Sequence, residues 1–309
     1  MKKIILLTML AGSVFSCQVT VQQENESPLI TKNQMTLATD IMTPEVLWSF
    51  GRLGDVQVSP DGQKILYGVS YYSIELNRSN RELFVMNADG SGKVQLTETP
   101  QNEFNAIWHP KGDRIVYLSS VSGEVQAWVM DPDGGNKQKI SNIEGGINSL
   151  IFSPTGNSAL YTRDVQIDRT TQDLYPDLPQ SDARIISDLM YRHWDTWEDG
   201  AYSHIFVADF NGKKISGGKD IMKGEPYESP MNFGGLEELA WTPDSRGIAY
   251  TCKKMGGVEY TFSTDSDIYL YDLESGLTSN LTKGMPGYDR VPFFSPDGSK
   301  LYWHSMERA

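Results

Sequence analysis

The side chains best suited to chemistry lie in one stretch, from Asp182 to His204, which is rich in aromatic and charged residues. Its two histidines, His193 and His204, are eleven positions apart. The carboxylates nearest to them in the sequence are Asp195, Glu198 and Asp199. Because imidazole and carboxylate groups bind metals and exchange protons, a metal site and an acid–base pair are both open interpretations.

The spacing in this stretch matches no fixed set of metal ligands, so a structural role is the simpler interpretation. Two tryptophans, Trp194 and Trp197, have the size to pack the stretch against the rest of the fold, and Arg192 can pair with a carboxylate. The residues that carry either interpretation are Arg192, His193, Trp194, Asp195 and His204. We predict no catalytic residue, no metal ligand and no cofactor-binding residue in this chain.

Two acidic turns, at 87–90 and 131–136, superficially look like calcium loops. They lack the twelve-residue loop that ends in a bidentate glutamate, so we interpret them as hairpin turns. The other two histidines, His109 and His304, stand where strands meet turns. We expect them to be hydrogen-bonded within the structure.

A repeat must position all these side chains. Five decapeptides share a proline two residues after an aromatic residue or Val, followed by Asp-Gly in two of them and by a close variant in the others. Their prolines are Pro60, Pro110, Pro154, Pro243 and Pro296. Successive prolines are 44 to 53 residues apart, except for one interval of 89, about two periods. In these turns Pro fixes φ and, where they are present, Asp bonds back to backbone amides and Gly accepts a left-handed conformation. A period of this size is typical of β-propeller blades.

A second hairpin follows in most repeats, so each repeat encodes a four-stranded blade. The predicted fold is therefore all-β, a β-propeller with blades at about 55–99, 104–142, 147–219, 236–283 and, incomplete, 289–309. The third blade carries an insertion at 163–203. Closed propellers usually have more blades and leave no sheet edge exposed, so we expect an incomplete propeller of about four and a half blades over 43–309.

Three segments resemble the propeller of the prolyl oligopeptidase family of serine peptidases. They are 43–62, which resembles its first part, 189–200 with 203–207, and 303–309, which resembles a passage midway through it. The second segment is similar to the acylaminoacyl-peptidase and bacterial dipeptidyl-peptidase V branch. Its run from Arg192 to Asp195 is the most specific part.

This resemblance implies a propeller that limits access to an α/β-hydrolase domain. It also implies that the full-length protein acts on peptides and that a homodimer through the hydrolase domain is possible. No Gly-x-Ser-x-Gly motif occurs in the 309 residues, so the catalytic Ser, Asp and His are not expected in them and enzyme activity of this chain is left open. Related dipeptidyl peptidases hold the substrate amine with two carboxylates, but the context of Glu237 and Glu238 differs and is typical of the first strand of a blade.

The leading hypothesis is the substrate-gating, non-catalytic propeller portion of an exported serine exopeptidase. Such an enzyme releases short peptides or dipeptides from peptide N-termini. The alternative is a TolB-like, non-catalytic propeller lipoprotein that binds partners in the cell envelope. The run from Arg192 to Asp195 favours the peptidase.

The N-terminus is typical of an export signal: two lysines precede a short apolar run that ends in small residues before Cys17. We expect a signal peptide at 1–16 and a flexible polar tether at 17–42. Cys17 is a lipidation candidate, although ordinary signal peptidase cleavage also fits. The resulting location is the periplasm or the outer membrane of a Gram-negative bacterium, with membrane contact only through the lipid. Order begins near Thr43, which can cap a short helix that starts with Pro44.

The bulk charge limits the partners. The formal net charge is −13 and no basic stripe offsets it, which argues against a nucleic-acid partner. Only two cysteines are present, Cys17 and Cys252, so disulfides do not build the fold.

Overall fold

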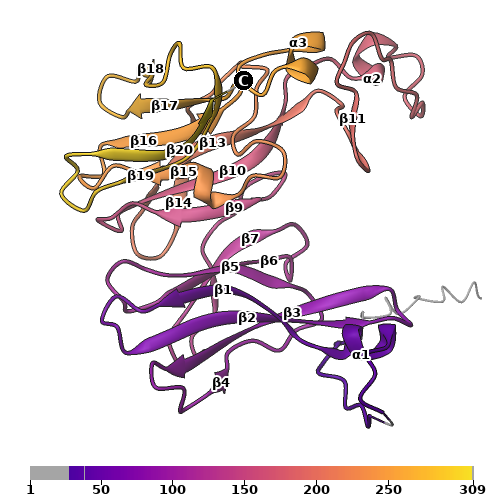
Figure 1. The fold of residues 1–309 in the computed structure, drawn as a ribbon, viewed down its shortest axis with the longest axis vertical. Coiled ribbons are helices and arrows are strands. Elements are labelled where there is room, and N and C mark those ends of the chain that lie inside the picture. Colours follow the sequence, from indigo (N-terminus) through magenta and orange to yellow (C-terminus); the bar gives the residue numbers. More distant parts are fainter. Residues whose placement is uncertain (1–27, 38, 308–309) are drawn as a thin grey trace, which may run out of the picture.

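Nearly all of the regular structure is β-sheet. A computed structural model describes residues 28–37 and 39–307 (Figure 1). Within them, four sheets have four antiparallel strands each, and two further sheets consist of one strand pair each. The predicted all-β fold of propeller blades is therefore confirmed. No helix in the described part of the chain is long and apolar enough to cross a membrane.

Each blade runs through its strands in sequence order from one edge of the sheet to the other. The first blade contains β1 (Arg52–Val58), β2 (Lys64–Ser73), β3 (Arg78–Asn87) and β4 (Val94–Gln95). The second contains β5 (Glu103–Trp108), β6 (Ile115–Ser119), β7 (Gln126–Met130) and β8 (Gln138–Lys139). The third contains β9 (Ser149–Phe152), β10 (Ser158–Gln166), β13 (Ala201–Phe210) and β14 (Ile215–Asp220).

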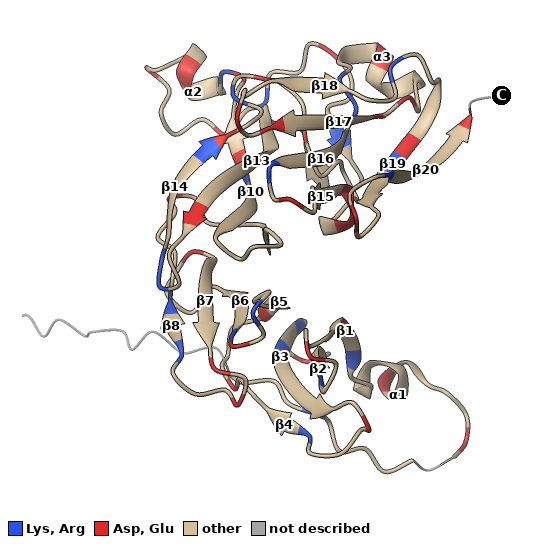
Figure 2. Cartoon of the chain, turned by 90° about the vertical axis from the view of Figure 1, so that its left-hand side faces the viewer, with Lys and Arg blue, Asp and Glu red and all other residues tan. Residues whose placement is uncertain are grey.

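The fourth blade contains β15 (Leu239–Trp241), β16 (Gly247–Cys252), β17 (Asp267–Asp272) and β18 (Thr278–Asn280), with helix α3 (Gly257–Phe262) between its second and third strands. The last hairpin pairs β19 (Gly287–Phe294) with β20 (Leu301–Glu307). Figure 2 shows the sheets following one another along an arc, with β1 near one end and β20 near the other. Helix α1 (Pro44–Ser49) precedes the first blade, and the side chain of Thr43 caps it by accepting a hydrogen bond from the amide of Val46.

The repeated turns have the predicted chemistry. In the first blade, Asp61 accepts hydrogen bonds from the Ser59 hydroxyl at 2.6 Å and from the Gln63 amide at 3.0 Å. Gly62 has a φ of 73°, the left-handed conformation that glycine adopts without strain. The turn of the last hairpin repeats the arrangement, since Asp297 accepts from the Ser295 hydroxyl at 2.6 Å.

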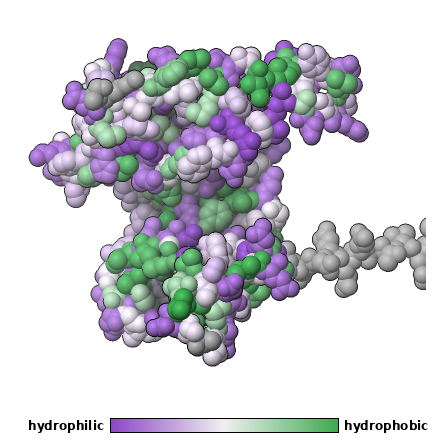
Figure 3. Space-filling view, turned by 45° about the vertical axis from the view of Figure 1, so that its right-hand side comes forward, coloured by the Kyte–Doolittle hydropathy of each residue, from purple (hydrophilic) through white to green (hydrophobic). Residues whose placement is uncertain are grey.

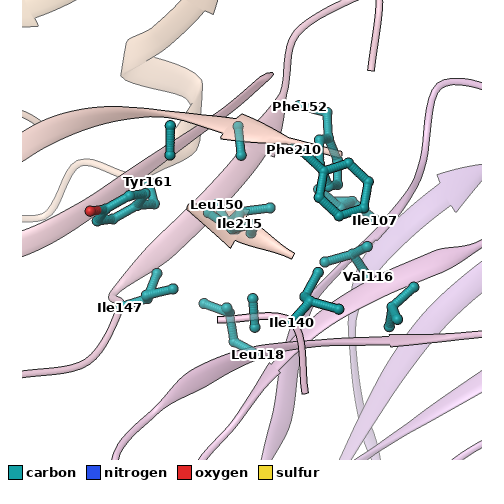
Figure 4. Close-up of a cluster of buried hydrophobic side chains, with 14 of the residues drawn as sticks. Ile107, Val116, Leu118, Ile140, Ile147, Leu150, Phe152, Tyr161, Phe210 and Ile215 are labelled. Carbon is teal, nitrogen blue, oxygen red and sulfur yellow. The ribbon is translucent and has the colours of Figure 1, made fainter. Parts of the chain in front are cut away.

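Hydrophobic side chains between neighbouring blades make up the core. One cluster lies between the second and third blades, where Phe152 and Phe210 pack beside Ile107 and Val116 (Figure 4). Similar clusters join the first blade to the second and the third to the fourth. Because each sheet buries a face only against its neighbour, the stacking of repeats is what stabilises each blade.

Three local features differ from the sequence-based expectations. Part of the expected tether contacts the first blade, because Ile30 is buried and the side-chain amide of Asn33 donates to the Tyr72 carbonyl oxygen. Strands β10 and β13 pair as far as Gln166, so the insertion is shorter than expected, at 167–200. Glu238 is not in a strand: it ends a short 3-10 helix, η1 (Leu236–Glu238), because its carboxylate turns inward to the Met231 amide. The predicted signal peptide and Cys17 lie outside the described residues.

Candidate functional site

The insertion of the third blade is built from short elements held by hydrogen bonds. It carries α2 (Thr171–Leu174) and the paired strands β11 (Arg192–His193) and β12 (Thr196–Trp197). Thr170 and Asp173 form a capping box that starts α2. At the base of the insertion, the Tyr202 hydroxyl donates to Asp168 at 2.9 Å.

Arg192 lies over an aromatic ring and not beside a carboxylate. The pairing of β11 with β12 puts Arg192 opposite Trp197, and its guanidinium carbon is 4.9 Å from the centre of that ring. Arg184 contacts the same ring at 4.5 Å. Arg192 takes part in none of the ion pairs found within 28–37 and 39–307, so the expected carboxylate partner is replaced by a cation–π contact.

His193, Trp194 and Phe233 form an aromatic cluster outside the blade. The rings of His193 and Trp194 lie 4.5 Å and 4.2 Å from the ring of Phe233, centre to centre. Trp194 was expected to pack the insertion against the blade, but its side chain is 76% exposed and contacts Phe233, with a φ of 50°. Asp195 is exposed at the tip between β11 and β12. Figure 3 shows hydrophobic side chains at the surface of the upper part of the molecule, which carries the insertion.

His204 is structural in its contacts and does not join His193. It lies fully buried in β13, where one ring nitrogen is 2.9 Å from the Asp220 carboxylate and the other is 3.0 Å from the Glu225 carbonyl oxygen. The two histidines that the sequence placed together therefore serve different contacts. No cluster of three or more potential metal ligands occurs in the part of the chain that the structure describes.

A pocket lies where the insertion meets the third and fourth blades. Its volume is about 110 Å³. The insertion provides Leu189, Met190 and Glu198, and strand β13 provides Tyr202. The remaining walls come from the loop with Glu228 and from the segment 253–260, which holds Lys253 and Tyr260. The pocket therefore has apolar and aromatic walls, two carboxylates and one lysine, and the excess of carboxylates suits an organic cation.

Hydrogen bonds hold the two carboxylates in place. Glu228 accepts from the Asn232 amide at 3.1 Å and from the Tyr260 hydroxyl at 3.3 Å. The side chain of Asn232 also donates to Glu198, at 3.1 Å, and so links the two acids. Burial, with a smaller effect of the charge on Glu198, raises the pKa of Glu228 to about 7. A cation in the pocket would relieve this repulsion.

Lys253 fixes the wall opposite the insertion. Its ammonium donates to the carbonyl oxygens of Tyr260 and Ser263, both at 2.5 Å, at the C-terminal end of α3. Burial lowers the pKa of Lys253. A cation at the end of a helix is the favourable arrangement, so Lys253 stabilises the helix that presents Tyr260 to the pocket.

Sequence reasoning missed Glu228 and Tyr260. Neither belongs to a spaced motif, and helix α3 was not expected inside the fourth blade. The only signal was indirect: Glu228 lies in the loop that joins the third blade to the fourth, and Tyr260 lies in the segment between β16 and β17. Three segments far apart in the sequence meet here because consecutive blades are neighbours in space.

Comparisons with known proteins identify relatives of the chain. No family model matches the chain. Over 283 residues it is 44% identical to dipeptidyl-peptidase 5 of Porphyromonas gingivalis, a match that covers 91% of the chain and 41% of that protein. Dipeptidyl-peptidase 5 of Porphyromonas endodontalis is 43% identical over 276 residues, 89% of the chain and 40% of that protein. The chain thus spans about two fifths of the length of these relatives.

A solved structure shows the fold. Acylaminoacyl peptidase of Pyrococcus horikoshii superposes with a TM-score of 0.53 at 15% identity, over 76% of the chain and 33% of that protein. The chain corresponds to the propeller part of the prolyl oligopeptidase family. The resemblance inferred from the segments at 43–62 and 189–207 is confirmed. In this propeller the insertion pocket combines acidic groups with aromatic walls, and it is the candidate site.

Proposed function

We propose that this chain is the substrate-gating, non-catalytic propeller portion of an exported serine exopeptidase that releases dipeptides or short peptides from N-termini. The names of the two Porphyromonas relatives support a peptidase over a TolB-like binding protein. In the full-length protein an α/β-hydrolase domain would supply the catalytic Ser, Asp and His. A homodimer through that domain is part of the same proposal.

The insertion pocket carries the proposed role of this segment. Glu198 and Glu228 would hold the ammonium group at the N-terminus of a peptide, and the side chain of the first residue would contact the apolar wall around Leu189 and Met190. A charge-assisted hydrogen bond contributes about 1.5–3 kcal/mol, so loss of one carboxylate should weaken binding about tenfold or more.

Calorimetric titration of the chain with a free tripeptide and its N-acetylated form tests this proposal. We expect the free peptide to bind, the acetylated peptide to bind at least about tenfold more weakly, and Glu228→Gln to remove most of this difference. Glu237→Gln is the matched control, because Glu237 is exposed and lies outside the pocket. Equal affinity for both peptides, or an equal effect of the two variants, would contradict the proposal.

The pH profile gives a second readout of the same site. Binding of an ammonium group needs ionised Glu228, whose pKa is about 7, so affinity should rise as the pH increases through 7. Above about pH 8 the peptide amine loses its own charge and affinity should fall again. Glu228→Gln should lose the rising limb of this profile.

The proposal includes export and a lipid anchor at Cys17. The charged start, the short apolar run and the small residue before Cys17 support it. Cys17→Ala should abolish incorporation of labelled palmitate and release a soluble or unprocessed form on fractionation. If Cys17→Ala fractionates as the wild type does and neither protein incorporates labelled palmitate, Cys17 does not carry a lipid anchor.

A further inference from the structure

Two carboxyl groups are buried together where the first blade meets the second. Glu82 lies in β3 and is 2% exposed, and Glu103 begins β5 and is 1% exposed. Buried acids are rare unless they are paired with a base. Neither is part of an ion pair among the described residues. Their burial therefore depends on contacts with uncharged groups.

Neutral donors satisfy one oxygen of each carboxyl. Glu82 Oε1 accepts from the side-chain amide of Asn80 at 2.5 Å and from the Thr99 backbone amide at 3.1 Å. Glu103 Oε1 accepts from the hydroxyl groups of Thr99 at 2.7 Å and Ser119 at 3.0 Å. Thr99 lies between the two blades and contacts both acids, so the pair belongs to the inter-blade contact.

The second oxygen of each carboxyl lacks such a donor. Glu82 Oε2 and Glu103 Oε2 are both buried and have no hydrogen-bonding partner among the described residues. Thr99 holds both carboxyl groups, its amide donating to Glu82 and its hydroxyl to Glu103, so the two acids are neighbours. Two carboxylates cannot hydrogen-bond each other without a proton, whereas a carboxylic acid and a carboxylate can. One proton between them supplies the missing donor.

We propose that Glu82 and Glu103 share one proton and form a pH-sensitive latch between the first two blades. Protonated, the pair is a hydrogen-bonded link from β3 to β5. Deprotonated, it places two like charges in a buried contact and weakens the junction.

The surrounding groups agree with this assignment. Burial, followed by the charge of Glu82, raises the pKa of Glu103 to about 7, and burial raises the pKa of Glu82 as well. Tyr117, on β6, is the titratable group that faces Glu103 from the second blade, and burial together with that charge raises its pKa. Tyr117 therefore stays neutral where the pair titrates.

The direction of the pH effect follows from the raised pKa. In the unfolded chain a glutamate has a pKa of about 4.3, and in the folded chain the pKa of Glu103 is about 7. The stabilisation by the shared proton is complete below the lower value and is lost as the pH rises to the upper one. As the pH rises across this window, the pair should increase the unfolding equilibrium constant about tenfold per pH unit.

Equilibrium urea unfolding of the full chain tests the latch. In Glu103→Gln the side-chain amide can donate permanently to Glu82, so the variant should lose this one-proton dependence and become more stable than the wild type near neutral pH. Glu98→Gln is the matched control, since Glu98 is exposed in the segment between β4 and β5, which also holds Thr99. This variant should keep the wild-type dependence of stability on pH. Identical slopes for Glu103→Gln and the wild type would overturn the proposal.

Two further measurements ask whether the pair holds a proton. Infrared difference spectra should show a protonated carboxyl that titrates near pH 7 and persists in Glu228→Gln, which lacks the other acid with a pKa of about 7. Its absence from that variant would overturn the proposal even if Glu103→Gln fails to fold. The wild type is expected to be less stable at neutral pH than at low pH. If Ca²⁺ restored this lost stability, the proposal would also be overturned, because the pair would then hold a cation and not a proton.

Discussion

Two aromatic pairs in this molecule have similar geometry but opposite surroundings. Phe152 and Phe210 lie 5.0 Å apart, centre to centre, between the second and third blades, and are 9% and 6% exposed. Trp194 and Phe233 lie 4.2 Å apart at the insertion and are 76% and 59% exposed. Both rings of the buried pair belong to the third blade and pack against the second blade, whereas the exposed pair joins a loop to the insertion. Ring geometry alone therefore does not reveal which contacts stabilise the fold.

The largest effect should come from the buried pair. Phe210→Ala removes a ring from the inter-blade core, where it contacts Phe152 and His109, and should lower the free energy of unfolding by about 3–5 kcal/mol. Urea unfolding monitored by circular dichroism measures this loss. Phe210→Leu keeps most of the apolar volume and should cost less. A loss below about 1 kcal/mol for the alanine variant would show that the blades do not depend on this contact.

The same contrast explains what the sequence could and could not predict. The turn at Ser59 and Asp61 is local: every group that shapes it lies within a few residues, so the repeat encodes it completely. The buried ring of Phe210 follows from strand alternation in a repeat that must pack on its neighbour. The blades were predictable because the same sequence pattern recurs in several repeats.

The insertion pocket was not predictable in the same way. Glu198 belongs to the third blade's insertion, Glu228 to the loop before the fourth blade, and Tyr260 to a helix inside the fourth blade. No period relates these positions, and their meeting depends on how adjacent blades are oriented. The open interpretation of His193 and His204 as a metal or acid–base pair finds no support for the converse reason. The two residues are close in the sequence, but their side chains contact different residues.

The smallest effect should come from the exposed pair. Trp194→Ala removes a ring that is mostly in solvent, at a residue whose φ of 50° already disfavours a large side chain. We expect the free energy of unfolding to fall by about 1.5 kcal/mol or less, measured as for Phe210→Ala. An isolated aromatic pair contributes about 0.5–1.5 kcal/mol beyond its buried area, and exposure of both rings removes most of the area term. A loss as large as that of Phe210→Ala would mean that the insertion unfolds together with the blades, and that its aromatic cluster is part of the core.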